Sequence, residues 1–165
     1  MNVAVLVAIA LASSPTPVGQ AHSREVAPAF IGTQWLNTKK PVRIDKVTIV
    51  HFWTLGCINC KRNLPIYNRW HDKFKETVNI VGIHTPELEF EKSVDSVKSA
   101  LRTWKIDYPV LVDAGAKNWK AWNQKYWPAI YVLDRTGVVR LKWEGELGED
   151  EGSFTKKIEE LIHAK

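Results

Sequence analysis

The sequence predicts a three-layer α/β fold in which helices cover both faces of a mixed central sheet. Short apolar runs rich in β-branched and aromatic residues, which are typical of buried strands, alternate with amphipathic segments of helical period. Strands that are joined by crossover helices run parallel to one another. The last two strands, 129–134 and 138–143, are instead separated by three residues ending in Gly137, which predicts an antiparallel hairpin before the last helix.

The first half of the chain predicts two strands and one long helix. Residues 33–44 predict a short strand and an irregular lead-in, and residues 46–53 form a β-branched and aromatic run typical of a central strand. In the helix that follows, Pro65 predicts a kink rather than an end, because the apolar face continues beyond it. That apolar face consists of Tyr67, Trp70 and Phe74.

The second half predicts strands at 78–83 and 109–112, with helices between and after them. Asp113 is expected to cap the N-terminus of the helical region that follows the second of these strands. Three apolar faces of helical period are visible in this half. They consist of Phe90, Val94, Val97, Leu101 and Trp104, then Trp119, Trp122 and Tyr126, and finally Phe154, Ile158, Leu161 and Ile162.

Length and charge limit the classes of protein to which the chain can belong. Its 165 residues predict one domain with a sizeable core. The net charge is +5, and acidic residues interrupt the basic ones, which favours a solvated surface over a nucleic-acid interface. The eight tryptophans, spread from Trp35 to Trp143, indicate packing rather than stacking on bases. We expect a monomer with no nucleic-acid partner.

The N-terminus differs in composition from the rest of the chain. Residues 1–21 are interpreted as a signal peptide, 22–30 as a linker and 31–165 as the folded domain. The apolar run 3–12 is shorter than a membrane span, which needs about 20 residues, and small residues around Ala21 suit a cleavage site. No Lys or Arg precedes the apolar run, unlike in most signal peptides. Export is expected, and a disordered tail on a cytosolic protein is the alternative.

Cys57 and Cys60 are the only cysteines, and they fall where the strand 46–53 turns into a helix. A C-x-x-C motif at such a junction is typical of redox dithiols. The first turn of a helix has unpaired N–H groups and the positive end of the dipole, which stabilise a thiolate and lower the pKa of its thiol. Cys57 lies nearest these groups, so we expect it to attack a disulfide and Cys60 to resolve the mixed disulfide.

Two other interpretations of this cysteine pair are weaker. A structural disulfide between such near neighbours closes a very short loop and therefore constrains the unfolded chain little. A structural zinc site needs four ligands, and the chain has no second pair of cysteines to supply them. We therefore expect a redox-active dithiol that holds no metal.

Trp127 and Pro128 form a second candidate site, directly before the strand that begins at Ala129. Proline is permitted at the first residue of a strand, and the peptide bond before it can be cis or trans. From the residues alone the trans form is favoured, because only about 5% of such bonds in folded proteins are cis.

Several stretches of the sequence match one known superfamily in order. The segment 52–60, with Pro65 eight residues after Cys57, resembles the active-site segment of thioredoxin-like proteins, and within them the TlpA-like group and its DipZ-like branch. Further matching stretches are 35–38, 81–87 and 126–131. The resemblance covers about residues 33–164 and is therefore more specific than the dithiol motif alone.

The resemblance implies a thioredoxin fold with an inserted helix-containing segment, and thiol–disulfide exchange in the periplasm or outside the cell. It implies a cis bond before Pro128, which would face the dithiol, and pairing of the Trp127 backbone with a bound substrate chain. The rings of Trp53 and Trp127 are expected to wall the substrate groove. No organic cofactor is expected, because a second dithiol protein, in this family typically a membrane electron conduit, supplies the electrons.

Three positions depart from the patterns of the family. His51 stands where many thioredoxins have a buried acid; a neutral imidazole could relay protons there, but a buried packing histidine is the favoured interpretation. Asn63 replaces a glutamate of related reductases, which puts a second acid of their mechanism in doubt. Gly56 replaces a common tryptophan, which is expected to open the groove and change the choice of substrate.

His84 and Glu87 follow the strand 78–83 at the edge where α/β sheets present functional loops. Local hydrogen bonding at the strand end is favoured over a direct role for this pair. The pair also bears on an alternative function, that of a copper chaperone of the Sco type, which uses two thiolates and a histidine on a thioredoxin fold. Those proteins have three residues between the cysteines, and His84 would have to approach the sulfur atoms.

Two questions stay open at this stage. One is whether the domain only binds peptides in its groove without turnover. The other is the direction of electron flow, because Ile58 and Asn59 between the cysteines are uncharged and do not set the reduction potential. A reductase that acts on protein disulfides or dithiols is the expected role.

Overall fold

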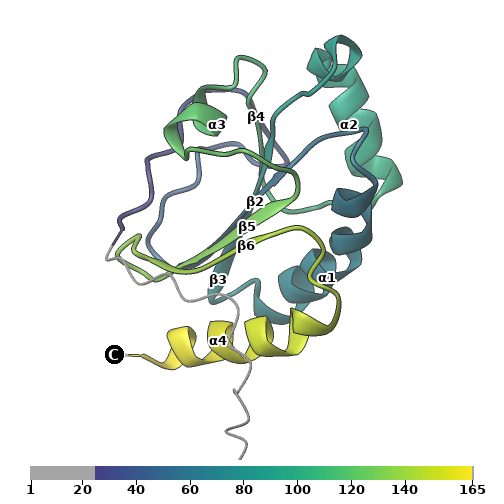
Figure 1. Cartoon of the computed structure of the whole chain (residues 1–165). Coiled ribbons are helices and arrows are strands. Elements are labelled where there is room, and N and C mark those ends of the chain that lie inside the picture. The colour runs from purple at the N-terminus through teal and green to yellow at the C-terminus, as the bar shows by residue number, and fades with distance from the viewer. Residues whose placement is uncertain (1–24, 165) are drawn as a thin grey trace, which may run out of the picture.

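A six-stranded mixed sheet forms the centre of the computed structural model, which describes residues 25–164 (Figure 1). The strands are β1 (Trp35–Leu36), β2 (Val47–Trp53), β3 (Val78–His84), β4 (Val110–Val112), β5 (Ala129–Leu133) and β6 (Val139–Glu144). The helices are α1 (Ile58–Phe74), η1 (Glu89–Lys92), α2 (Val94–Thr103), α3 (Lys117–Ala121), η2 (Gly148–Asp150) and α4 (Glu151–His163). The predicted signal peptide 1–21 lies outside the described residues. No helix within 25–164 is long and apolar enough to cross a membrane.

β2 lies in the middle of the sheet, whose strand order is β1-β4-β3-β2-β5-β6. It runs parallel to β3 and antiparallel to β5, with Phe52 opposite Ala129. β3 and β4 are also parallel, while β1 and β6 lie antiparallel to their neighbours at the two edges. The predicted mixed sheet with a final antiparallel hairpin is therefore confirmed. Pro65 does not end α1, as predicted.

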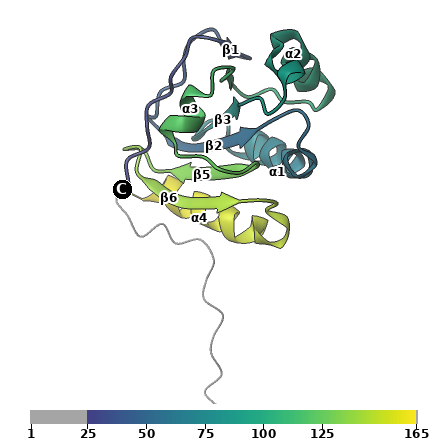
Figure 2. The same ribbon diagram turned by 45° about the horizontal axis from the view of Figure 1, so that its top comes forward.

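Alternate residues of β2 supply the two halves of the core, because side chains on a strand point to opposite faces in turn. Ile49 and Trp53 pack in the cluster that includes residues of α1, α2 and α4. Val50 and Phe52 pack in a second cluster with Trp122, at the end of α3. Figures 1 and 2 show α3 on one side of the sheet and α1 and α4 on the other. Both faces of β2 are covered, and all seven of its residues are buried.

The helix predicted from the pattern that starts at Phe90 begins later than that pattern suggests. α2 starts at Val94, after Ser93, whose side-chain oxygen accepts a hydrogen bond from the backbone N–H of Ser96 at 3.3 Å. Phe90 lies on η1 and is 60% exposed. Its assignment to the apolar face of the helix is wrong, because a serine N-cap starts the helix after Phe90 although the apolar period extends further.

Asp113 holds the region after β4 in place, although it is not the N-cap residue of α3. That position is taken by Ala116, which has a left-handed backbone conformation. The carboxylate of Asp113 nevertheless accepts hydrogen bonds from the backbone N–H groups of Asn118 and Trp119 at 3.1 and 2.9 Å. The short helix ends before Tyr126, which is exposed rather than part of an apolar helical face.

Part of the segment that the composition predicts to be a linker packs on the domain. The backbone N–H of Ala27 donates to the carbonyl of Gly137 at 2.8 Å, and the N–H of Val139 donates to the carbonyl of Glu25 at 2.9 Å. Ala27 is buried among residues of β2, β3 and β5. The turn between β5 and β6 is therefore tied to residues 25–27.

Asn63 joins α1 to the turn that follows β6. Its side-chain amide donates to the carbonyl of Gly145 at 3.0 Å and to the hydroxyl of Tyr67 at 3.1 Å, and its oxygen accepts from the backbone N–H of Leu147 at 2.9 Å. These three bonds satisfy a buried amide that would otherwise be costly to remove from water. The residue that replaces a family glutamate is thus a structural link in this chain.

Candidate active site

The two cysteines lie at the junction between β2 and α1. Cys57 is the N-cap residue of α1, with an extended backbone conformation, and it is joined to Cys60 by a disulfide. The sulfur of Cys57 accepts a hydrogen bond from the backbone N–H of Cys60 at 3.1 Å. An N-cap side chain is aimed at the unpaired amides of the first turn, and α1 has no acidic residue in that turn. The junction therefore favours negative charge on this sulfur.

The two sulfur atoms differ in access to solvent. Cys60 is only 2% exposed and packs in the core cluster beneath α1. Cys57 is partly exposed, and its neighbours Gly56 and Ile58 are exposed. The arrangement presents one sulfur to a partner and keeps the other behind it, as a nucleophile and a resolving thiol require.

The peptide bond between Trp127 and Pro128 is cis. Because Phe52 pairs with Ala129 across the antiparallel β2–β5 ladder, Pro128 lies next to the end of β2, from which the chain continues to Cys57. The ring of Trp127 stacks on that of Trp119 with centroids 4.0 Å apart and remains partly exposed. The structure thus places Pro128 and Trp127 at the same edge of the sheet as the dithiol.

Trp53 does not wall a groove, contrary to the expectation from the sequence. It is 1% exposed, and its ring packs edge-on against His84 at 4.9 Å and against Trp104 at 5.7 Å. The reason is the alternation of β2, which turns residue 53 into the core beneath the helices. Trp53 therefore supports the dithiol loop from below and cannot touch a substrate.

Gly56 is exposed and makes a close approach to an acid that the sequence analysis did not identify. Its backbone N–H donates to Oε1 of Glu91 at 2.6 Å, and a Cβ atom at position 56 would lie 3.1 Å from the same oxygen. Glu91 belongs to η1 and is fully buried. The only sequence signal was weak: an acid three residues before Val94, on the apolar side of the helical pattern.

His51 lies in the core, with its ring 4.4 Å from that of Tyr67 and 5.5 Å from that of Tyr108. It is fully buried, and neither ring nitrogen has a hydrogen-bond partner among the described residues. Burial disfavours the charged imidazolium and lowers the pKa of His51 to about 3. The side chain is therefore neutral at physiological pH.

The structure does not bring His84 and Glu87 together. His84 is buried beneath Trp53, and burial lowers its pKa to about 4 despite the opposing effect of Glu91. Glu87 is exposed and contributes its backbone N–H to Glu91. Within residues 25–164, no three side chains of His, Cys, Asp or Glu are grouped closely enough to hold a metal ion.

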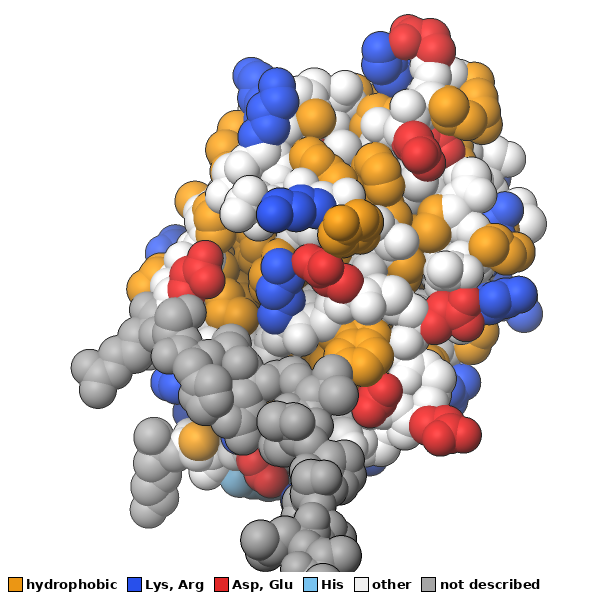
Figure 3. All heavy atoms as spheres, viewed as in Figure 1, with side chains coloured by type: hydrophobic (Ala, Val, Ile, Leu, Met, Phe, Trp, Pro, Cys, Tyr) orange, Lys and Arg blue, Asp and Glu red, His pale blue; other side chains and the backbone are white. Residues whose placement is uncertain are grey.

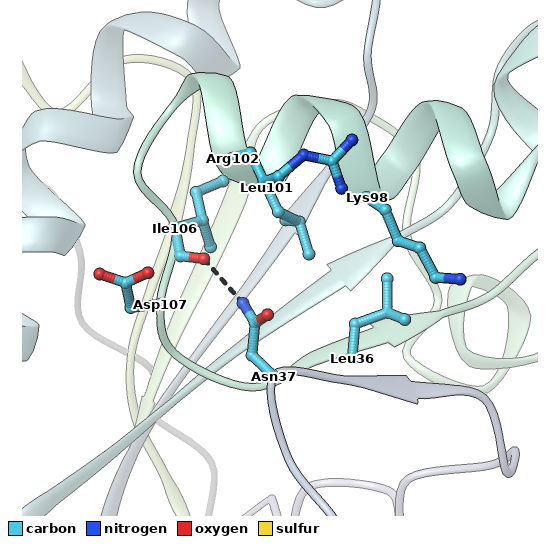
Figure 4. A pocket seen from close by; sticks show the side chains of 7 residues that line it. All are labelled: Leu36, Asn37, Lys98, Leu101, Arg102, Ile106 and Asp107. Atoms are coloured by element: carbon cyan, nitrogen blue, oxygen red, sulfur yellow. Dashed lines mark hydrogen bonds between the residues drawn. The ribbon is translucent and has the colours of Figure 1, made fainter.

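A hollow of about 280 Å³ between β1 and α2 lies outside this site (Figure 4). Lys98 and Arg102 reach toward it from α2, and the side-chain amide of Asn37 donates to the carbonyl of Ile106 at 2.7 Å. Neither cysteine lines it. On the face of the molecule drawn in Figure 3, basic and acidic side chains are interspersed, as the sequence predicts.

Comparisons with known proteins identify the relatives of this chain. The sequence pattern of the AhpC/TSA family matches residues 25–142. The chain is 37% identical over 129 residues to Protein DipZ of Mycobacterium bovis, a match that covers 73% of the chain and 19% of DipZ. It is 32% identical over 144 residues to Thiol-disulfide oxidoreductase YkuV of Bacillus subtilis, which covers 85% of the chain and 93% of YkuV.

A solved structure shows the same fold. The solution structure of a thioredoxin-like protein in the oxidised form matches with a TM-score of 0.73 and 29% identity, covering 84% of this chain and 95% of that one. The chain spans about a fifth of the length of DipZ but nearly the whole of YkuV. Together with the disulfide at the start of α1, these matches confirm the predicted family and fold. The chain belongs to the AhpC/TSA family, has a thioredoxin-like fold, and is similar over most of its length to a thiol-disulfide oxidoreductase.

Proposed function

We propose that this chain exchanges electrons with protein disulfides, with Cys57 as the nucleophile and Cys60 as the resolving thiol. The observation that carries the proposal is the position of Cys57, a partly exposed N-cap residue whose sulfur accepts an amide N–H from the first turn of α1. A thiolate in that position is stabilised and exposed, which are the two properties that disulfide exchange requires.

The exchange proceeds in two balanced steps. The Cys57 thiolate attacks one sulfur of a substrate disulfide, a mixed disulfide forms, and the other substrate sulfur leaves as a thiolate. The Cys60 thiol loses its proton and attacks the sulfur of Cys57, which restores the internal disulfide and releases the second substrate thiolate. Two electrons pass from the dithiol to the substrate, and solvent balances the protons. A further dithiol protein must then reduce the Cys57–Cys60 disulfide again, and we propose a membrane electron donor for this step.

We propose that the substrate chain lies along Trp127 and Pro128 while Cys57 attacks it. Support comes from the register of β2 and β5, which brings Pro128 next to the end of β2. The exposed side chains of Ile58 and Tyr126 offer apolar contacts near the two segments. Gly56, which has no side chain, leaves the approach to Cys57 open on this side.

Replacement of each cysteine by serine tests the assignment of roles. Cys60→Ser should hold a substrate protein in a mixed disulfide at Cys57, because the resolving thiol is missing. Cys57→Ser should trap no substrate and should lower the rate of insulin disulfide reduction by at least about a hundredfold, because the nucleophile is missing. The trapped complex is measured by non-reducing electrophoresis and mass spectrometry. Trapping by the Cys57→Ser variant instead would reverse the two roles.

We propose that His51 is a packing residue of the core rather than a proton relay. Its lowered pKa makes it a weak base at neutral pH, and general bases work best with a pKa near the working pH. Its ring is enclosed by the rings of Tyr67 and Tyr108. This proposal predicts an effect on stability instead of an effect on rate.

The free energy of unfolding should decrease as the pH is lowered below about 6.5, because His51 must stay neutral in the folded state. The unfolded chain binds a proton at this residue below a pH of about 6.5, whereas the folded protein does so only near 3. Between these values each pH unit costs about 1.4 kcal/mol. His51→Leu should remove this part of the slope in urea unfolding from pH 6 to pH 4, whereas exposed His163→Leu should not.

The same variant separates the two interpretations of His51. At pH 7, His51→Leu should reduce insulin disulfides within about threefold of the wild-type rate. A loss of about a hundredfold, which is typical of a missing general base, together with an unchanged stability slope, would establish the proton relay instead.

We propose that the chain acts outside the cytoplasm. We also propose that it is a monomer, which sedimentation velocity can check. The apolar run 3–12 and the small residues around Ala21 support export. Residues 1–21 fused to alkaline phosphatase, which is active only after export, should give active enzyme in a bacterial host. Replacement of Leu6 and Val7 by arginine should abolish that activity. An intact but inactive wild-type fusion that stays in the cytoplasm would contradict the proposal.

A further inference from the structure

A buried carboxylate lies directly beneath the loop that leads to the dithiol. Glu91 on η1 is fully buried, and its Oε1 accepts the backbone N–H of Gly56 at 2.6 Å. Its Oε2 accepts the hydroxyl of Thr54 at 2.7 Å and the backbone N–H groups of Glu87 and Leu88 at 2.7 and 2.9 Å. The short helix η1, in the segment that follows β3, is therefore fastened to residues 54–56, immediately before Cys57, through a single side chain.

This carboxylate is charged in the folded protein. Burial alone would raise the pKa of Glu91, but the hydrogen bonds from Thr54 and from the backbone of Leu88, Gly56 and Glu87 outweigh it, so the pKa is lowered. A carboxylate that accepts several N–H and O–H groups is stabilised as the anion. The loop therefore carries a fixed negative charge beneath it at neutral pH.

No basic group neutralises that charge in the part of the chain that the structure describes. Glu91 takes part in none of the ion pairs formed by residues 25–164. His84 lies near enough for the two groups to interact, but burial keeps this histidine neutral. Asp113, the other acid that acts on His84, has the same sign of charge as Glu91 and therefore does not neutralise it.

We propose that Glu91 is a positioning residue that biases the dithiol toward giving up electrons, an inference that rests on the exchange function of Cys57. In the reduced state the Cys57 thiolate would stand one residue from Gly56, whose amide Glu91 holds. The negative charges of the Glu91 carboxylate and the Cys57 thiolate repel each other, and the burial of Glu91 reduces the screening of this repulsion by water. Formation of the Cys57–Cys60 disulfide removes the thiolate charge, so the repulsion is relieved when two electrons pass to a substrate disulfide.

The proposal assigns a direction to a pair that the sequence left undecided. A disulfide protein is a strong oxidant when its reduced form is stabilised, and destabilisation of the reduced form has the opposite effect. Glu91 destabilises the reduced form and therefore favours a reductant. Glycine at position 56 favours this contact, because a Cβ atom there would lie 3.1 Å from Oε1 and would push the carboxylate away.

Glu91→Gln tests the proposal because it removes the charge and keeps the size of the side chain. At equilibrium with glutathione at pH 7, the ratio of dithiol to disulfide should be about three to ten times higher in the variant than in the wild type. A tenfold change corresponds to about 30 mV for this two-electron couple. The pKa of the Cys57 thiol, followed by thiolate absorbance, should fall by about half a unit to one unit.

Thr54→Val is a second variant that disturbs the same contact, but it should shift the glutathione equilibrium in the opposite direction. It removes one donor to the carboxylate and keeps the negative charge, which then acts less screened on Cys57. We expect about a twofold shift of the glutathione equilibrium toward the disulfide. Glu89→Gln is the matched control, because that side chain is 86% exposed on the same turn and should leave the equilibrium unchanged.

The proposal stands if Glu91→Gln raises the dithiol fraction and Thr54→Val does not. If Glu91→Gln fails to fold, it stands only if Thr54→Val lowers that fraction. A folded Glu91→Gln variant with a wild-type equilibrium and a wild-type Cys57 pKa would show a purely structural role and overturn it. A wild-type protein that equilibrates with glutathione but reduces no protein disulfide would contradict the proposed function alone.

Discussion

The hydrogen bond between the Cys57 sulfur and the backbone N–H of Cys60 is the interaction around which this structure is arranged. It exists because β2 ends at Trp53 and α1 begins at Ile58, so that Cys57 is the N-cap of the helix. A strand buried on both faces fixes where the chain emerges, and the helix supplies the unpaired amides. On the proposed function, the reactivity of this sulfur follows from the position at which the strand and the helix meet.

The surrounding layers hold this junction from three sides. Beneath it, Trp53 packs on His84 and Trp104, and the neutral ring of His51 fills the core under α1. Across the β2–β5 ladder, the register brings Pro128 to the same edge. From η1, Glu91 fastens the loop between β2 and α1. Only this last support carries a charge, which is why we connect it with the direction of electron flow.

Much of the fold was predictable because it depends on local patterns. The period of the apolar residues identified the strands and main helices, and the dithiol motif identified the chemistry. Three features do not follow from these patterns, the first because of a local cap and the other two because of tertiary contacts. Phe90 continues a helical period but lies outside the helix, because Ser93 caps the helix after it. The sequence resemblance places Trp53 in the wall of the groove, but its ring points into the core. Glu91 has no motif, since its role comes from four donors distant in sequence or contributed by backbone.

The central claim is that the position of Cys57 at the start of α1 makes it the reactive thiol. Brief alkylation of the reduced protein with iodoacetamide, followed by peptide mass spectrometry over a range of pH, measures this at each cysteine separately. The account predicts that Cys57 is labelled at least about tenfold faster than Cys60, with half-maximal labelling below the ordinary thiol pKa of about 8.5. Equal labelling of both cysteines, or faster labelling of Cys60, would contradict it.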